Sequence, residues 1–328
     1  MERVVVTGGT GFIGSRLIEE LTRNQIEVVA LVRDARTNRL DGVSNKRLLK
    51  LVQYDSDEFH ALEVDACKQL IDAFYHLAWA GVSTEQKNDS NLQLENIHLS
   101  MQMLEYAKKI GAGRFLGMGT VAEYAFSENT IEADGNKQTP NDMYGAAKTS
   151  AHYMLEAYAR VLDMPFNWVV LPSTFGEGRR DDNIITYTIT MLLRGKRPQY
   201  GALMQMWDFL YVGEVARALR LIGERGCYAK TYGIGSGVYR QLKDYIVKLR
   251  DIINPELELG IGEVPSLSHK AFSSCVNIYE LAKDTGFEPE VSFEEGIRKT
   301  IRYYQKQMRS EMDHENSDES EWPHNQNI

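Results

Sequence analysis

The chain has 328 residues, of which 43% are hydrophobic and 25% are charged, and its formal net charge is −9. This composition is typical of a folded globular protein, and the acidic balance argues against nucleic acid as a partner. No apolar run approaches the about 20 residues that a membrane-spanning helix needs, so we expect no membrane partner. The cysteines and the seven histidines show no spacing typical of disulfide frameworks or metal ligands. We therefore expect a cytoplasmic protein without a metal site.

The N-terminal residues hold the strongest motif of the chain. Residues 3–6 read as a buried strand, residues 7–14 are the glycine-rich run TGGTGFIG, and residues 15–21 carry apolar side chains at helical spacing. Because the strand begins at once, we expect no signal peptide. Strand, glycine turn and helix in this order favour a site for the pyrophosphate of a dinucleotide over an ordinary tight turn, because glycine lets the backbone approach the phosphates. The predicted contacts are Gly8, Gly11, Phe12, Ile13 and Gly14.

Strand and helix patterns alternate through the first half of the chain. Further strands are predicted at 26–32, 48–52, 73–78, 114–118 and 166–171, and helices at 92–110 and 144–161. This alternation is typical of a parallel sheet that helices cover on both faces. The predicted fold is α/β, a Rossmann-type doubly wound parallel sheet with a smaller C-terminal lobe.

The pattern becomes irregular after residue 175. A strand is predicted near 231–234, and helices near 241–253 and 293–307. We predict a dinucleotide-binding domain that the chain re-enters late, a smaller substrate-binding lobe and, because the C-terminal residues are polar and acidic, a disordered tail. The boundaries are 1–175 with re-entry around 205–235 for the domain, 176–308 for the lobe and 309–328 for the tail.

The end of the second strand bears on the choice of dinucleotide. NAD-binding proteins place an acidic residue there for the ribose 2′-hydroxyl, whereas Val32 and Arg33 stand there in this chain. An arginine can pair with the 2′-phosphate of NADP, and Arg36 could add a second positive charge. NADP(H) is favoured for this reason. NAD(H) stays possible if Arg33 is a surface residue and Asp34 takes the acidic role.

Tyr144 and Lys148 carry the catalytic prediction. Four residues apart on one helix, they share a face. An ammonium beside a phenol is expected to lower the pKa of that phenol, which would make tyrosine usable as an acid or base. Thr120 follows the predicted strand at 114–118, where strand ends face the ligand crevice. We predict Thr120, Tyr144 and Lys148 as catalytic residues, the last two also in contact with the cofactor.

Together these motifs resemble the extended short-chain dehydrogenase/reductase family, in its group of nucleotide-sugar epimerases, dehydratases and reductases. The resemblance covers about residues 3–305 and is carried by the glycine turn, His76-Leu77-Ala78, Asn96 in its helix, the residues 120, 144 and 148, and the segments 207–216 and 277–289. It implies a nucleotide-sugar substrate and a homodimer that forms through the helices at 92–110 and 144–161. Further cofactor contacts are expected at Asp55, Leu77 and Ala78.

The residues after Thr120 indicate which reaction a member of this group catalyses. Sugar 4,6-dehydratases of the family carry Thr-Asp-Glu, whereas Val121 and Ala122 here can act neither as acid nor as base. Dehydration is therefore not expected. Because epimerases of this group usually hold NAD tightly and recycle it, the expected preference for NADP favours a 4-ketoreductase of a nucleotide-linked 4-keto-6-deoxy sugar. The alternatives are a nucleotide-sugar 4-epimerase with tightly bound NAD, an NADP-dependent reductase of a non-sugar carbonyl, and a non-catalytic dinucleotide-sensing protein.

The substrate contacts depart from the family pattern. Trp207 replaces the arginine that many members use for the substrate pyrophosphate, so Arg179, Arg180 or Lys270 would have to supply the positive charge. Trp207 itself would stack on a base or pack in the core. The predicted substrate-binding residues are Trp79, Glu123, Ser173, Thr174, Arg179, Asn183 and Trp207.

Overall fold

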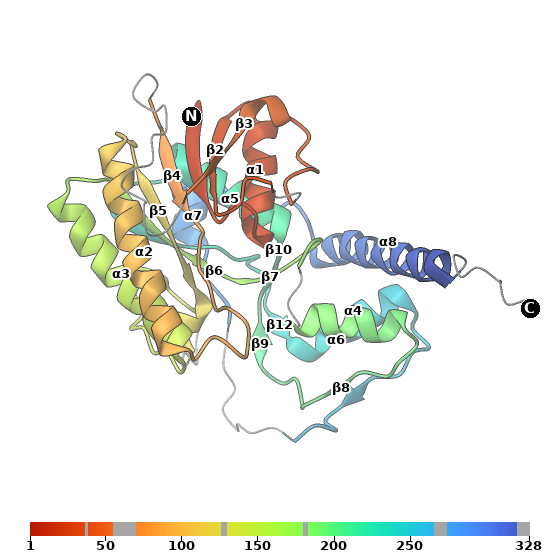
Figure 1. Cartoon of the computed structure of the whole chain (residues 1–328). Helices are drawn as coiled ribbons and strands as arrows, with labels where there is room; N and C mark the ends of the chain where they lie inside the picture. The colour runs from red at the N-terminus through yellow and green to blue at the C-terminus, as the bar shows by residue number, and fades with distance from the viewer. Residues whose placement is uncertain (37–38, 55–69, 126–129, 180–182, 266–273, 320–328) are drawn as a thin grey trace, which may run out of the picture.

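A seven-stranded, fully parallel sheet forms the centre of the molecule (Figure 1). The computed structural model describes residues 1–36, 39–54, 70–125, 130–179, 183–265 and 274–319, with the side chains of residues 311–319 left aside. In spatial order the strands are β11 (Lys230–Gly233), β6 (Phe166–Leu171), β5 (Phe115–Thr120), β4 (Ala73–His76), β1 (Arg3–Thr7), β2 (Glu27–Val32) and β3 (Leu49–Gln53). The order reverses at β1, as in a doubly wound sheet, which confirms the predicted fold class.

The strands are apolar on both faces because helices cover both faces. Val4 and Val6 of β1 point to one side, and Val5 points to the other. Two helices cover the Val5 face, and three cover the opposite face. The first layer holds α2 (Ser90–Lys109) and α3 (Met143–Val161), and the second holds α1 (Phe12–Arg23), α5 (Val212–Arg225) and α7 (Tyr279–Thr285).

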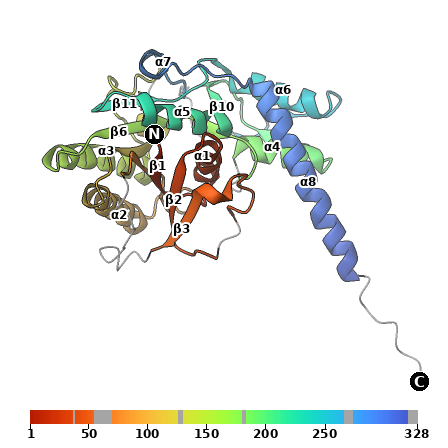
Figure 2. The same ribbon diagram turned by 90° about the horizontal axis from the view of Figure 1, so that it is seen from above.

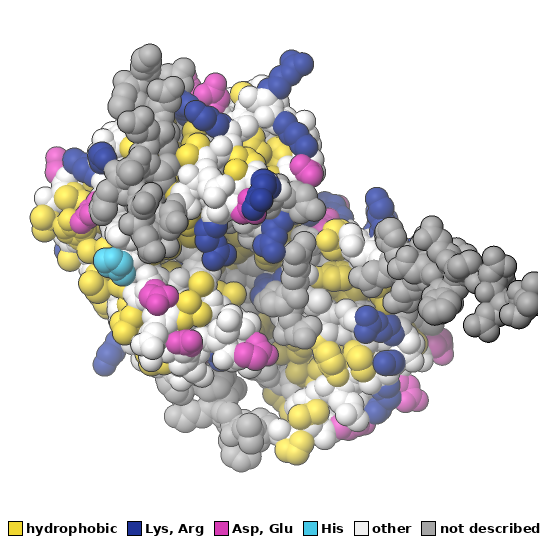
Figure 3. Space-filling model, viewed as in Figure 1, with side chains coloured by type: hydrophobic (Ala, Val, Ile, Leu, Met, Phe, Trp, Pro, Cys, Tyr) yellow, Lys and Arg dark blue, Asp and Glu magenta, His cyan; other side chains and the backbone are white. Residues whose placement is uncertain are grey.

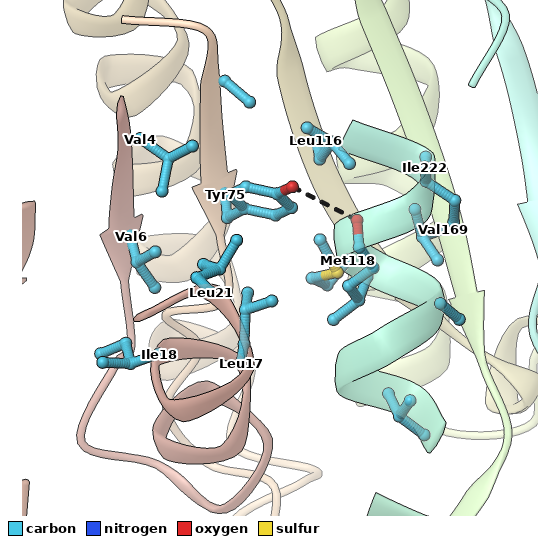
Figure 4. Packing of buried hydrophobic residues seen from close by; sticks show 14 of the residues in the cluster. Val4, Val6, Leu17, Ile18, Leu21, Tyr75, Leu116, Met118, Val169 and Ile222 are labelled. Atoms are coloured by element: carbon cyan, nitrogen blue, oxygen red, sulfur yellow. Dashed lines mark hydrogen bonds between the residues drawn. The ribbon is translucent and has the colours of Figure 1, made fainter. Parts of the chain in front are cut away.

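Figure 4 shows how the second layer closes on the sheet. Leu17 and Leu21 of α1 pack beside the ring of Tyr75 on β4, and Ile222 of α5 approaches from the other side. The buried Tyr75 hydroxyl donates to the carbonyl of Leu219 on α5 (3.3 Å). A tyrosine in the core is tolerated because this bond satisfies its hydroxyl.

The C-terminal lobe has a separate hydrophobic core. It is built on α4 (Ile184–Leu193), α6 (Leu242–Ile253) and the start of α8 (Phe293–Glu319). Phe209 lies at its centre, with the rings of Tyr245 and Phe293 5.1 and 6.0 Å away between centroids. Short strand pairs complete the lobe: β7 (Ser173–Phe175) with β10 (Phe209–Tyr211), β9 (Met206–Trp207) with β12 (Arg240–Gln241), and β8 (Gln199–Tyr200) with β13 (Gly260–Ile261).

The chain crosses between the two cores more often than the sequence indicates. The return of α5 and β11 to the sheet lies where re-entry was expected, but a second return follows at α7. Leu281 and Phe287 are buried with α5 in the core of the sheet. A helix of seven residues has too few turns to give a clear periodic pattern. The boundaries of the two domains stay a prediction.

Helix α8 differs from the prediction for the C-terminal residues. A disordered tail was expected from residue 309, but the helix runs to Glu319, and residues 320–328 lie outside the described residues. Its first turns are fixed by the buried Ile297 and Ile301, and extending an existing helix costs far less than starting one. Figure 2 shows its far end projecting from the body. In the described part of the chain, no helix is both long and apolar enough to cross a membrane.

Candidate active site

The turn between β1 and α1 leaves no room for side chains. Gly8 has a φ of +68°, and a Cβ on it would lie 2.6 Å from the backbone of Leu77 and of Ala78. A Cβ on Gly14 would lie 2.2 Å from the carbonyl oxygen of Gly8. The turn is closed by the Gly11 N–H, which donates to that same carbonyl (2.9 Å). Only glycine at these positions allows strand, turn and helix to pack this closely.

The N-terminus of α1 is suited to an anion. Gly11 is the N-cap residue, and no side chain caps this end of the helix. The first N–H groups of a helix carry partial positive charge and bind anions when side chains do not occupy them. The turn forms one wall of a cavity of about 900 Å³. All five predicted turn contacts and Leu77 line this cavity, while Ala78 approaches Gly8 through its backbone.

Cationic side chains surround the cavity. Figure 3 shows Lys and Arg side chains gathered around the hollow between the two lobes. The cations that line the cavity come from α1, α3, α8 and loops: Arg16, Arg23, Arg39, Lys148, Arg179 and Lys299. The lining also contains the carboxylates of Glu19, Glu20 and Glu177, so cations outnumber anions there, in contrast to the acidic chain as a whole. An excess of positive charge suits an anionic ligand.

The three predicted catalytic residues meet in this cavity. Thr120 ends β5, and Tyr144 and Lys148 lie in the first two turns of α3. Asp142 caps α3 by accepting from the N–H of Gly145 (2.8 Å), which fixes the turn that carries Tyr144. Thr120 and Tyr144 lie close enough for the Thr120 side chain to affect the pKa of Tyr144. All three residues predicted as catalytic therefore line one cavity, and their catalytic role stays a prediction.

The expected lowering of the Tyr144 pKa is not what the structure shows. Burial raises the pKa of Tyr144 to about 12, and the side chain of Thr120 and the charge of Arg179 only partly oppose this rise. Removing the phenol from water disfavours its anion more than nearby donors favour it. Tyr144 is thus a neutral phenol with a proton to give at neutral pH.

Lys148 lies among neutral groups. Its Nζ donates to the carbonyl of Met118 (2.7 Å) and lies 3.6 Å from the centre of the Trp79 ring. The Trp79 indole donates in turn to Gln93 (2.9 Å), and its ring meets Tyr144 edge-on. Burial lowers the pKa of Lys148 to about 7, against a raising effect of Glu123. Trp79 lines the cavity, as expected of a substrate contact, and also holds the lysine.

A buried hydrogen-bond chain supports the wall behind the cavity. Ser100 donates to the carbonyl of Asn96 (2.7 Å), so its oxygen accepts from Nε2–H of His76 (2.9 Å). Nδ1 of His76 then accepts from the hydroxyl of Thr7 (2.8 Å). Burial lowers the pKa of His76 to about 3, which keeps the ring neutral. The Asn96 amide also bonds both backbone groups of Ala80 and thereby fixes the chain after β4.

The expectation for Glu123 was wrong. Glu123 is fully buried behind Thr120 and does not line the cavity. Its carboxylate accepts from the N–H of Thr120 (2.8 Å), while Thr120 caps the short helix Val121–Tyr124. The spacing Thr-x-x-Glu is that of a capping box, a signal that predicts a backbone contact rather than a substrate contact.

Three further predicted substrate contacts lie away from the cavity. Ser173 pairs with β10, Asn183 caps α4 through the N–H groups of Ile185 and Thr186, and Trp207 packs against the core of the lobe. None of the three lines the cavity, whereas Thr174 and Arg179 do. The hydroxyl of Thr174 donates to the carbonyl of Pro172 (3.1 Å). Asp55, Arg180 and Lys270 lie outside the described residues.

The arginine after β2 is also not where the sequence suggests. Arg33 is exposed and does not line the cavity, and Arg36 is bound to Asp34 (3.0 Å). Arg39 lines the cavity instead. Its place follows from the course of the chain after β2, which no local motif encodes.

Sequence reasoning also missed two residues of α8. Lys299 and Tyr303 line the cavity although they lie 120 and 124 positions after Arg179, the last predicted contact that lines it. Their spacing of four residues places them on one helix face, but only the packing of the lobe brings that face to the cavity.

The pKa of Lys148 gives a testable stability effect. Between about pH 7 and the ordinary value of 10.5, the unfolded chain binds this proton more tightly than the folded chain does. The contribution of Lys148 to the free energy of unfolding therefore rises with pH over this range. We predict that the stability of wild type relative to Lys148→Met increases from about pH 7 to about pH 9, measured by urea denaturation. The exposed Lys243→Met is the control, and a pH-independent difference for Lys148→Met would contradict the prediction.

Comparison with known proteins identifies the family. The model of the NAD dependent epimerase/dehydratase family matches residues 4–235. Curated relatives include the dTDP-D-glucose 4,6-dehydratase of Mus musculus, 24% identical over 93% of this chain and 89% of the relative. Another is the dTDP-glucose 4,6-dehydratase of Neisseria meningitidis serogroup B, 26% identical over 93% of each chain.

Solved structures share the fold over nearly the whole chain. UDP-glucuronic acid 4-epimerase from Bacillus cereus, in complex with UDP-glucuronic acid and NAD, has a TM-score of 0.81 at 22% identity, covering 93% of this chain and 99% of its own. UDP-glucose 4-epimerase from Thermotoga maritima, with UDP-glucose, has a TM-score of 0.78 at 24% identity, with the same coverage. The chain therefore belongs to the NAD dependent epimerase/dehydratase family, which confirms the predicted resemblance to enzymes of the extended short-chain dehydrogenase/reductase type.

Proposed function

We propose that this enzyme reduces the 4-keto group of a nucleotide-linked 4-keto-6-deoxy sugar with a nicotinamide dinucleotide. The observation that carries the proposal is one cavity that joins the glycine turn to Thr120, Tyr144 and Lys148. The short helix Val121–Tyr124, which follows Thr120, supplies no second acid for dehydration. A glycine turn beside a tyrosine and a lysine supports hydride-transfer chemistry, and the lack of a second acid argues against dehydration.

The glycine turn fits a dinucleotide pyrophosphate. A Cβ on Gly14 would collide with Gly8, so only glycine keeps the turn this tight. The uncapped N-terminus of α1 adds N–H donors for an anion. Gly8, Gly11, Phe12, Ile13 and Gly14 would hold the pyrophosphate. When bound, the nicotinamide supplies a hydride for the sugar carbon.

The chain itself supplies the proton and the orientation. Thr120 and Tyr144 are proposed to bond the keto oxygen, and Tyr144 gives its proton to that oxygen as the hydroxyl forms. A phenol whose pKa is raised to about 12 is fully protonated at neutral pH, as a proton donor must be. The charged form of Lys148 then stabilises the phenolate that remains.

The short helix after Thr120 argues against dehydration. Loss of water from the sugar needs an acid and a base beside the reacting carbons, and Val121 and Ala122 provide neither. The carboxylate of this helix, Glu123, is turned away from the cavity and is bound to the backbone of Thr120. The dehydratases among the relatives are only 23–26% identical, so they do not decide the reaction.

A nucleotide-sugar substrate is supported by the cations of the cavity. Arg179 lines it, with its guanidinium carbon 5.4 Å from the centre of the Phe12 ring, and Lys299 lines it from α8. Guanidinium and ammonium groups are the common partners of a diphosphate. We propose that these two residues replace the missing arginine at Trp207.

A 4-epimerase is the second candidate. It is favoured by the structural neighbours, which include 4-epimerases solved with NAD and a UDP-sugar. An epimerase recycles its bound cofactor, whereas a reductase consumes the reduced dinucleotide. Net consumption therefore separates the two functions.

The proposed reaction is tested by turnover of purified enzyme. With dTDP-, GDP-, CDP- or UDP-linked 4-keto-6-deoxy sugars and NADPH, we expect NADPH oxidation matched by one 4-hydroxy product. Tyr144→Phe should lower kcat by about 100-fold or more, because the proton donor is lost. The exposed Tyr279→Phe is the control. Interconversion of UDP-glucose and UDP-galactose without NADPH oxidation would instead establish the epimerase.

We further propose that NADP(H) is preferred and that Arg39 pairs with its 2′-phosphate. The carboxylate nearest the end of β2, Asp34, is bound by Arg36, and Arg39 lies in the cavity wall. Because a charge-assisted hydrogen bond contributes about 1.5–3 kcal/mol, Arg39→Ala should weaken NADPH binding by about tenfold or more and leave NADH binding unchanged. Arg36→Ala is the matched control. Tighter binding of NADH by wild type, measured by fluorescence titration, would contradict this preference.

A homodimer through α2 and α3 is proposed from an exposed apolar stripe. Along α3, the exposed Met143, Met154 and Val161 share one helix face, Tyr153 is exposed next to Met154, and Leu94 is exposed on α2. Figure 3 shows hydrophobic side chains on the edge of the molecule that α3 forms. An apolar stripe of this kind is typical of a helix that packs against a partner.

The dimer is tested by a charge in the stripe. Met154→Glu should convert the dimer to a monomer, because a carboxylate at the centre of a helix interface is costly to bury. Val238→Glu is the matched control, since both side chains are 47% exposed. Light scattering after size-exclusion chromatography gives the mass, and a wild-type monomer would refute the proposal.

A further inference from the structure

Glu123 is a buried carboxylate that the proposed reaction leaves without a role. One oxygen, Oε1, accepts from the N–H of Thr120 (2.8 Å) and from the indole of Trp168 (3.2 Å). The other oxygen, Oε2, has no hydrogen-bond partner among the described residues and lies 3.8 Å from Nδ1 of His152. A buried charge is costly unless it is paired, so this group needs an explanation.

His152 is held in place from its other sides. Its ring stacks on Trp168 with 4.9 Å between centroids, and its Nε2 lies 3.2 Å from the hydroxyl of Thr231. Nδ1 has no hydrogen-bond partner in the described part of the structure and faces the carboxylate. A proton on Nδ1 would place a donor opposite Oε2, and Nε2 would then accept from Thr231.

The pair lies directly beside the catalytic residues. Tyr144, Lys148 and His152 follow one another at intervals of four residues, so they share one face of α3. Glu123 faces His152 on this face of α3 and is bound to the backbone N–H of Thr120. The neighbours of the Lys148 ammonium, the Met118 carbonyl and the Trp79 ring, are uncharged.

We propose that Glu123, anchored by His152, is the buried counter-charge of Lys148 and fixes Thr120. It is a positioning residue, because it acts through Lys148 and Thr120 and does not line the cavity. The proposal rests on the reductase function for its kinetic test, but the pair itself can be examined without any substrate.

Electrostatics supports this role. Burial lowers the pKa of Lys148 to about 7, and the charge of Glu123 opposes that lowering. Without Glu123, the pKa of Lys148 would fall further, so a smaller fraction of Lys148 would be charged at neutral pH. The same carboxylate helps to raise the pKa of Tyr144, as does Asp142, while Arg179 acts in the opposite sense. Two further titratable rings face these charges. The pKa of Tyr124 is raised chiefly by burial and then by Glu123, and the pKa of His76 on β4 is lowered chiefly by burial and then by the charge of Lys148.

The kinetic test uses Glu123→Gln. Glutamine keeps an acceptor for the N–H of Thr120 and removes the charge. We expect the alkaline limb of the pH profile of kcat/KM, which reports loss of the Lys148 proton, to move to lower pH by about one unit. KM near the acidic end of the profile should stay unchanged, and Glu123→Asp should restore the limb. A purely structural role would lower the rate at every pH without moving the limb, and that outcome would overturn the proposal.

His152→Gln is the second variant, should Glu123→Gln fold poorly. It removes the anchor and leaves the carboxylate, so the limb should move in the same direction by a smaller amount. Thermal unfolding of each variant verifies that the compared proteins are folded. No movement of the limb in a folded His152→Gln would remove the anchor from the proposal.

Nitrogen NMR of the histidine rings tests the pair independently of catalysis. The resonances of His152 are assigned by their loss in His152→Gln. In wild type at neutral pH we expect Nδ1 to carry a proton, and this preference should disappear in Glu123→Gln. An unprotonated Nδ1 in wild type would overturn the pair. A protonated Nδ1 in a protein that reduces no 4-keto sugar would instead refute only the reductase function.

Discussion

Parallel strands place all their carboxyl ends at one edge of a sheet, and this constraint assembles the site. β1 leads into Gly8 there, β4 leads into Leu77 and Trp79, and β5 ends at Thr120. The cavity then needs only α3 beside β5 to add Tyr144 and Lys148. Because every strand pair of the seven-stranded sheet is parallel, groups that lie far apart in the sequence meet without special loops.

Local chemistry decided which parts of the site could be predicted. The glycine turn and the spacing of Tyr144 and Lys148 are encoded within a few residues, so the sequence predicts them well. Glu123 was assigned to the cavity because it lies close to Thr120 in the sequence, whereas its capping-box spacing indicates a contact with the backbone. Lys299 reaches the cavity only through the packing of α8, which no local sequence motif predicts. The cytoplasmic location stays a prediction.

The two buried histidines show how the protein treats polar groups in its interior. In His76 the bonds of Ser100 and Thr7 place the ring proton on Nε2. In His152 the proposed proton is on Nδ1, facing Glu123. Both rings thus take the tautomer that their neighbours can satisfy, which lets buried polar chains stiffen the walls of the cavity. Lys148 is the exception. Its burial among neutral groups lowers its pKa and disfavours its charged form, a loss of stability that is common at functional sites.

The repeated crossing of the chain between its two cores has a consequence for how the enzyme family can diversify. The sheet core needs residues from β1 through β6, then α5 and β11, and finally α7, while the lobe uses the segments between and after them. No single cut in the chain separates the two cores. The lobe therefore cannot be exchanged as a cassette by gene fusion. A change of ligand that keeps this fold is therefore simplest by substitution or loop insertion in the segments that line the cavity.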